Sequence, residues 1–313
     1  MDKTNTIFIA GHQGMVGSAI YKNLNSKGYN NLILADKREL DLRDTRAVEF
    51  FFNKNKPDYV FLAAAKVGGI QSNIEDPVGF LYDNLMIQNN VISQCFYHKV
   101  KKILFLGSSC IYPKECPQPM KEEYLLTGPL EPTNEGYALA KITGYKLLQY
   151  YRRQYNMPFV CPMPCNLYGP GDSFDIKKSH VLSALIKRFV DATDKGKKVV
   201  TLLGSGVARR EFMHVDDLAE ACFVLMKCNN KSDIINIGWD KDISIKELAY
   251  LIAEQTNYLG EIRFDFKHPD GMLLKRLEVS KMINIGFTPK ISLKQGISEM
   301  VQIYKTIKEQ NNS

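Results

Sequence analysis

The 313-residue sequence lacks the features of several large classes of protein. It contains no apolar stretch approaching the roughly 20 residues that a helix needs to cross a bilayer. Residues 1–6 lead directly into the apolar run 7–10, which leaves no room for a charged and cleavable export signal. We therefore expect a cytoplasmic protein that has no membrane partner.

Cysteine occurs without the patterns that would indicate a structural role. The seven cysteines form no Cys-x-x-Cys motif and have no histidine partners at the spacing of zinc ligands. Because their number is odd, they cannot all pair within one chain. We predict reduced thiols and no metal site.

Basic residues are numerous but are not clustered. The formal net charge is +7, yet no basic block with interleaved aromatic residues occurs. Nucleic acid is therefore not an expected partner. The charge would suit a substrate that carries a diphosphate, but a lysine-rich solvated surface explains it equally well.

The sequence does contain a regular series of short apolar runs separated by helical patterns. The runs lack polar alternation, as expected for strands that are buried on both faces of a parallel sheet. This pattern predicts an α/β fold with a doubly wound parallel Rossmann sheet over residues 1–164. The expected strands are 7–10, 32–35, 59–62, 103–107 and 159–162, and the expected helices are 16–27, 45–53, 78–98 and 136–155.

Beyond residue 164 the series ends and loops rich in glycine begin. We expect a smaller C-terminal α/β substrate domain over residues 165–313, with a segment near 213–238 returning to the first domain. Asp216 or Asp217 is expected to cap a helix, and a second helix should begin at the capping box that starts with Ser244.

A glycine motif lies between the first expected strand and helix. Gly11, Gly14 and Gly17 have the spacing of the dinucleotide fingerprint, in which they permit a tight turn, a close approach to the diphosphate, and packing of the helix on the strand. Backbone N–H groups at the start of the helix would then face the phosphates. The same turn includes further expected cofactor contacts at Gln13, Met15 and Val16.

The next two strand ends give further candidates for the cofactor site. Asp36 ends the second strand, where an acid would normally bind the adenine ribose and select NAD. Lys37 and Arg38 follow at once and could instead bind a ribose 2'-phosphate, so these residues alone do not decide between NAD and NADP. Ala63 and Ala64 leave space for a cofactor against the sheet, although small residues would also serve packing.

Tyr137 and Lys141 are one helical turn apart, so both side chains lie on one helix face. Reduction of a ketone needs a proton donor and hydrogen bonds to the oxygen that becomes negative. Tyr137 would donate the proton, and Lys141 together with the positively charged nicotinamide would lower the pKa of the phenol. Lys141 could also bind the nicotinamide ribose. Ser108 or Ser109, at the end of the fourth strand, would bind the substrate oxygen, and we favour Ser108.

Two of the expected helices are apolar over more than one face, which suggests that they are buried against a second copy as well as the sheet. This pattern predicts a homodimer; the alternative is a monomer whose second domain covers them. The apolar positions in helices 78–98 and 136–155 include Leu81, Leu85, Val91, Ile142, Tyr145 and Leu148.

Several longer segments of the sequence identify a protein family more specifically than the glycine motif does. They are residues 9–20, 62–70 (LAAAKVGGI), 104–113 (LFLGSSCIYP), 131–135 (EPTNE) and 210–212 (REF). In these blocks the sequence resembles the extended short-chain dehydrogenase/reductases and, more narrowly, the GDP-L-fucose synthase family. The resemblance covers nearly the whole chain.

The resemblance implies an enzyme that epimerises C3 and C5 of GDP-4-keto-6-deoxy-D-mannose and then reduces C4, with NADP(H) as cofactor and a GDP-linked keto-sugar as substrate. It implies that Ser108, Tyr137 and Lys141 carry the reduction. It also implies that Cys110 and His180 exchange protons during epimerisation, which is chemically reasonable because a thiol and an imidazole titrate near neutral pH.

The resemblance also assigns binding residues. Cofactor contacts are implied at Leu106, Pro164, Asn166, Leu167 and His180, and substrate contacts at Ser108, Ser109, Asn166, Arg188, Leu203, Arg210 and Asp270.

The chain departs from the family pattern at several of these positions. Gln13 stands where the family usually has arginine, and residues 35–37 replace an Arg-Thr-Arg sequence, which weakens the case for NADP. Leu203 stands in place of a tryptophan at the substrate. A C4 reductase of a GDP-4-keto-heptose, or of another GDP-keto-sugar, without epimerase activity is therefore the main alternative. A nucleotide-binding sensor without chemistry is a third interpretation.

Overall fold

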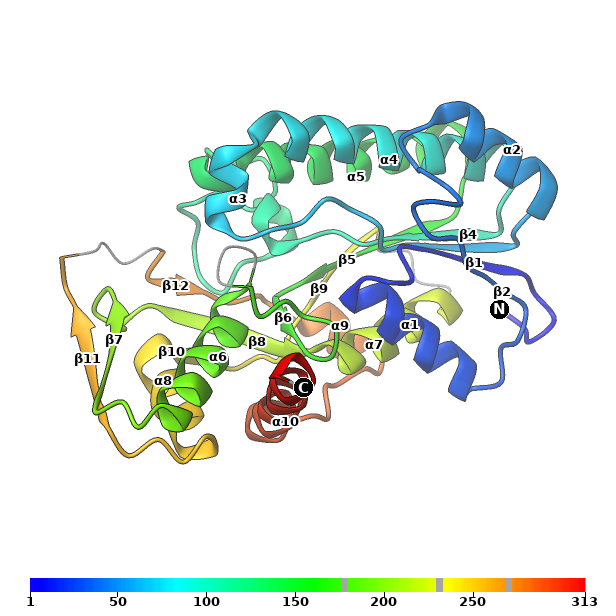
Figure 1. Cartoon of the computed structure of the whole chain (residues 1–313). Coiled ribbons are helices and arrows are strands. Elements are labelled where there is room, and N and C mark those ends of the chain that lie inside the picture. The colour runs from blue at the N-terminus through cyan, green and yellow to red at the C-terminus, as the bar shows by residue number, and fades with distance from the viewer. Residues whose placement is uncertain (176–178, 229–232, 268–271, 313) are drawn as a thin grey trace.

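A parallel sheet of six strands forms the centre of the N-terminal half in the computed structural model, which describes residues 1–175, 179–228, 233–267 and 272–312 (Figure 1). The strand order is β2-β1-β3-β4-β5-β9, and every neighbouring pair is parallel. The strands are β1 (Ile7–Ala10), β2 (Leu32–Ile33), β3 (Tyr59–Leu62), β4 (Lys102–Phe105), β5 (Phe159–Pro164) and β9 (Ile234–Ile237). The predicted doubly wound Rossmann sheet is confirmed.

Helices cover both faces of this sheet (Figure 1). One layer contains α2 (Thr45–Asn55), α4 (Pro77–Tyr97) and α5 (Glu135–Tyr155), and the opposite layer contains α1 (Met15–Ser26) and α7 (Val215–Lys227). A short helix, α3 (Ile70–Glu75), precedes α4, and 3-10 turns η1 (Ser109–Ile111), η2 (Glu122–Tyr124) and η3 (Pro132–Asn134) lie between β4 and α5.

The core of this half is apolar and rich in phenylalanine. Its fully buried members include Phe8, Phe52, Phe61, Phe105 and Phe159, which come from β1, α2, β3, β4 and β5. Burial of each of these side chains contributes about 1.5–3 kcal/mol to the stability of the fold. The strands are therefore held firmly, and they support the residues that follow their carboxyl ends.

The C-terminal half contains a smaller sheet and its own buried apolar cluster. Strand β8 (Arg209–His214) pairs with β10 (Asp242–Ser244), β12 (Leu274–Lys275) and β6 (Asn166–Tyr168), while β7 (Val199–Leu203) and β11 (Glu261–Asp265) form a separate parallel pair. The helices are α6 (Val181–Asp194), α8 (Ile245–Gln255), α9 (Ser280–Asn284) and α10 (Leu293–Asn312).

Of the two helix caps predicted from the sequence, one is confirmed and one is wrong. Ser244 and Glu247 form the predicted capping box at α8. Helix α7, however, begins at Val215 and is capped by the His214 side chain, so the prediction that Asp216 or Asp217 caps it is wrong. The Asp217 carboxylate instead accepts hydrogen bonds from two backbone N–H groups before α10.

No helix among the described residues is both long enough and apolar enough to cross a membrane.

Candidate active site

The glycine turn joins β1 to α1 with very little spare volume. Gly11 has a φ of +89°, and a Cβ atom there would lie 2.7 Å from the backbone nitrogen of Ala64 in the segment after β3. A Cβ atom on Gly17 would lie 2.0 Å from the carbonyl oxygen of Gly11. Gly14, the N-cap of α1, is exposed, and the first turn of the helix carries no acidic side chain. These features fit a diphosphate at the positive end of α1.

Replacing Gly17 with alanine is expected to lower the free energy of unfolding by about 1–3 kcal/mol, because backbone atoms block the new methyl group and α1 must move away from β1. Dinucleotide binding should weaken at the same time. Thermal unfolding and fluorescence titration with the dinucleotide measure the two effects.

Gly14→Ala is the matched control, because its methyl group would lie no closer than 3.5 Å to the Gly11 oxygen. This variant should keep its stability and lose only affinity for the dinucleotide. A Gly17→Ala protein that unfolds and binds like the wild type would contradict the tight packing of the turn.

The acid after β2 is bound within its own loop. Strand β2 ends at Ile33, two residues earlier than predicted, and the Asp36 carboxylate accepts hydrogen bonds from the backbone N–H groups of Arg38 (2.7 Å) and Glu39 (3.1 Å). The Arg38 guanidinium also contacts Asp36 at 3.0 Å and holds the pKa of that carboxyl below its usual value. Lys37 and Arg38 are themselves exposed. The loop therefore contains an ion pair between Asp36 and Arg38, and Lys37 is a further exposed cation beside it.

Lys141 fixes helix α5 to the end of β4. Its side chain is only 2% exposed, and its ammonium donates to the carbonyl oxygen of Leu106 at 2.7 Å. The same ammonium lies 5.8 Å from the ring centre of Tyr137, so both side chains face the sheet edge as the helical spacing predicts. Burial lowers the pKa of Lys141 to about 8.

The phenol of Tyr137 is partly buried, and its protonation differs from the prediction. Burial raises its pKa above the usual value, Cys110 adds to the rise, and a hydrogen bond with Ser108 opposes it. The predicted lowering by Lys141 is therefore wrong for the residues of the chain alone, because desolvation dominates. The neutral phenol, which is the proton-donating form, is present at neutral pH.

Ser108 is the accessible serine of the pair after β4. It is partly exposed and caps η1, where its hydroxyl accepts a hydrogen bond from the Cys110 N–H at 3.2 Å, whereas Ser109 is buried. Ser108 follows β4 and Tyr137 lies on the first turn of α5, and the Ser108 hydroxyl is close enough to lower the pKa of the Tyr137 phenol. This geometry agrees with the choice of Ser108.

Two hydrogen-bond donors lie beside the Cys110 sulfur, and neither was predicted as a site residue from the sequence. The Asn134 amide nitrogen lies 3.3 Å from its sulfur, and the Lys275 ammonium lies 3.7 Å from it. Asn134 ends η3 just before α5, and Lys275 comes from β12 in the C-terminal half. Cys110 is partly exposed, so it is not a small core residue. Asn134 lay within the family block 131–135, but no local signal placed Lys275 beside the thiol.

His180 stands at the N-terminus of α6 and is 45% exposed. Its Nδ1 atom lies 3.3 Å from the carboxylate of Asp172, and this hydrogen bond raises the pKa of the imidazole. Nδ1 of the imidazole is therefore bound to Asp172, while the ring remains partly accessible to solvent.

The other predicted binding residues lie in several strands, in the segment after β3 and on helix α6. Asn166 in β6 donates to the Glu211 carbonyl at 3.0 Å, and Arg210 in β8 donates to the Met272 carbonyl at 2.5 Å. Arg188 on α6 donates to the Thr201 carbonyl at 2.9 Å, and Leu203 is 63% exposed at the end of β7. Pro164 ends β5, Leu167 lies in β6, Ala63 and Ala64 follow β3, and Asp270 lies outside the described residues.

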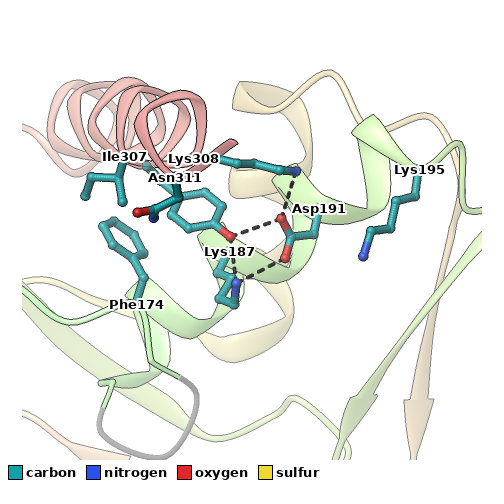
Figure 2. Close-up of a pocket in the computed structure, with 8 residues that line it drawn as sticks. Phe174, Lys187, Asp191, Lys195, Ile307, Lys308 and Asn311 are labelled. Carbon is teal, nitrogen blue, oxygen red and sulfur yellow. Dashed lines mark hydrogen bonds and ion pairs between the residues drawn. The ribbon is translucent and has the colours of Figure 1, made fainter. Parts of the chain in front are cut away.

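A separate pocket lies between α6 and α10 (Figure 2). Asp191 accepts hydrogen bonds there from Lys187 (3.2 Å), Tyr304 (3.0 Å) and Lys308 (3.1 Å). Lys187 also donates to the Tyr304 hydroxyl at 2.7 Å. None of the predicted site residues lines this pocket, and its polar groups join the two helices.

Comparison with known proteins places this arrangement in a family. Residues 7–238 match the model of the NAD dependent epimerase/dehydratase family. A protein named putative GDP-L-fucose synthase 2 from Arabidopsis thaliana is 50% identical over 304 residues, which cover 97% of this chain and 93% of the relative. Among solved structures, a GDP-mannoheptose C4 reductase from Campylobacter jejuni with NADP bound is similar, with a TM-score of 0.88, 38% identity, and coverage of 97% of this chain and 99% of that one. A GDP-L-fucose synthetase from Naegleria fowleri bound to NADP has a TM-score of 0.90 and 27% identity, and the match covers 99% of this chain and 96% of that one.

The resemblance to the GDP-L-fucose synthases is thus confirmed, and the chain belongs to the NAD dependent epimerase/dehydratase family.

Proposed function

We propose that this protein reduces the C4 ketone of a GDP-4-keto-6-deoxy-sugar with NADPH after epimerising C3 and C5. The observation that carries the proposal is the grouping of Ser108, Tyr137, Lys141 and Cys110 at the carboxyl edge of the sheet that also holds the glycine turn. The names of the relatives, which include GDP-L-fucose synthases and a GDP-mannoheptose C4 reductase, support the substrate class.

NADP(H) is the proposed cofactor. The glycine turn fits a diphosphate, and the exposed Lys37 and Arg38 fit the extra phosphate of NADP. The Asp36 carboxylate already has three donors, which reduces the repulsion that a free acid would exert on that phosphate. NADP in two solved relatives supports the same choice.

In the reduction, bound NADPH would supply the hydride. The Tyr137 and Ser108 hydroxyls would both bond the C4 oxygen, and Tyr137 would donate its proton as charge develops there. Lys141 would hold α5 against β4 through Leu106, so that the phenol keeps its position.

In the epimerisation, the same two hydroxyls would stabilise the enolate that forms when a proton leaves C3 or C5. Cys110 and His180 would remove and return protons on opposite faces of the sugar. The Lys275 ammonium and the Asn134 amide beside Cys110 would hold its sulfur in place for these transfers.

The test is incubation with GDP-4-keto-6-deoxy-D-mannose and NADPH in heavy water, followed by location of the deuterium. The proposal expects NADPH oxidation and deuterium at C3 and C5 of the product. Oxidation without deuterium would favour the C4 reductase of another GDP-keto-sugar, the alternative indicated by Leu203 in place of the family's tryptophan. No oxidation with any GDP-keto-sugar would favour a binding protein.

We also propose a homodimer through α4 and α5. Four of the apolar residues that suggested it, Val91, Ile142, Tyr145 and Leu148, are buried within the single chain and carry no such argument. The outer face of the two helices nevertheless exposes other apolar side chains, and Figure 1 shows this layer at the surface. The exposed residues include Val78, Tyr82, Tyr97, Leu139 and Tyr150.

Replacing both Tyr82 and Leu139 by glutamate should convert the dimer to a monomer, because negative charges without partners would be buried at the interface. Light scattering after size-exclusion chromatography measures the mass. Tyr250→Glu is the control, since Tyr250 is similarly exposed on α8. A wild-type mass of one chain would refute the proposed dimer.

A further inference from the structure

The loop after β6 contains a carboxylate whose environment the reaction described above does not explain. The Asp172 side chain is only 5% exposed, although aspartate is rarely buried without a partner. Within the described part of the chain, no lysine or arginine forms an ion pair with it. Its oxygens are held by the Ser173 N–H at 2.9 Å and by the Ser183 hydroxyl at 2.5 Å, and the His180 imidazole lies 3.3 Å away.

These contacts form a line from the interior to the surface. Ser183 is fully buried in the first turn of α6, Asp172 lies next to it, and His180 is exposed at the N-cap of the same helix. Because His180 and Ser183 are three residues apart on a helix start, one carboxylate can reach both. The Ser183 hydroxyl fixes one Asp172 oxygen and leaves the other for the imidazole.

We propose that Asp172 is a positioning residue, which together with Ser183 orients His180 for proton transfer to the substrate. This inference rests on the proposed epimerisation. A carboxylate at Nδ1 keeps the proton on that nitrogen, fixes the plane of the ring, and leaves Nε2 as the atom that faces the substrate.

The charge of Asp172 serves the same purpose. The hydrogen bond that the His180 Nδ1–H donates to the Asp172 carboxylate raises the pKa of the imidazole, so the imidazolium is more abundant at neutral pH. In the step that returns a proton, the Nε2–H bond breaks and a C–H bond forms, while the enolate electrons restore the ketone. The imidazole is then neutral, and it regains its proton from water.

The inference is tested with Asp172→Asn and Ser183→Ala, and with Asp191→Asn as the matched control, because Asp191 is bonded to lysines in the pocket of Figure 2. Deuterium incorporation into the keto-sugar should fall about 10- to 100-fold in Asp172→Asn, within the contribution of a positioned proton donor. Dissociation constants for NADPH and for GDP should not change. The dependence of deuterium incorporation on pH should move to lower pH.

Proton NMR gives a second readout that does not require activity. The chain has five histidines, and His180→Gln identifies the signal of His180. Its titration should move to lower pH in Asp172→Asn and should stay unchanged in Asp191→Asn. If Asp172→Asn does not fold, Ser183→Ala decides by the same measurements, with a smaller expected loss.

Unchanged deuterium incorporation and an unchanged His180 titration in a folded variant would overturn the inference. Equal losses of incorporation and of NADPH and GDP binding would also overturn it, because they would indicate a structural role. Failure of the wild type to incorporate deuterium would instead refute the proposed epimerisation, and with it the catalytic part of the inference, while the NMR titration would still test the pairing of Asp172 with His180.

Discussion

Replacing Tyr137 with phenylalanine is expected to reduce the rate of NADPH oxidation with the keto-sugar by about 10²- to 10⁴-fold, the range that a positioned proton donor contributes. The substitution removes only the hydroxyl that would donate to the C4 oxygen. The ring and its packing near Lys141 remain, so the fold and the cofactor site should be preserved. Single-turnover oxidation, followed by the loss of NADPH absorbance, measures the chemical step directly.

Tyr145→Phe is the matched control, since Tyr145 lies two turns further along α5 and its hydroxyl accepts a hydrogen bond from Gln149. This variant should keep a rate within a few-fold of the wild type. Unchanged dissociation constants for NADPH in both variants would assign the loss to chemistry. A Tyr137→Phe protein that reduces the sugar at the wild-type rate would exclude the phenol as the proton donor.

The central sheet could be predicted because its signals are local. The apolar runs at 7–10 and 59–62 coincide with β1 and β3, and the glycine spacing at 11–17 places the turn and the start of α1. Strands buried on both faces need no alternation, so four consecutive apolar residues are sufficient evidence. The Tyr137 and Lys141 pair could be predicted for the same reason, because a spacing of four residues on a helix fixes a shared face.

The parts that the sequence did not reveal depend on contacts between distant segments. Lys275 reaches Cys110 across 165 positions, and nothing near either residue indicates the other. Protonation is similarly non-local: whether the pKa of Tyr137 rises or falls depends on the balance between desolvation and the distance to Lys141, and the lysine bonds a carbonyl instead. The cap of α7 was missed because His214 is an unusual N-cap, whereas the acidic residues after it are common ones.

Replacing Cys110 with serine is expected to lower deuterium incorporation at C3 and C5 by about 10²- to 10⁴-fold while leaving C4 reduction of an already epimerised sugar within about tenfold of the wild type. A serine hydroxyl is nearly the same size as a thiol, but it is far less acidic and cannot act as the base near neutral pH. The Asn134 and Lys275 donors would remain beside it, so the packing between β12 and η1 should persist. Mass spectrometry of the sugar after incubation in heavy water without NADPH measures the exchange in isolation.

Cys228→Ser serves as the control, because Cys228 is also partly exposed but lies at the C-terminal end of α7. It should exchange deuterium at the wild-type rate. Comparison with Tyr137→Phe separates the two reactions. Tyr137→Phe should lose reduction of the ketone, whereas Cys110→Ser should lose deuterium exchange and retain reduction. If wild-type and Cys110→Ser proteins both reduce a GDP-keto-sugar and neither incorporates deuterium, the thiol has no role as a base and the protein is a C4 reductase alone.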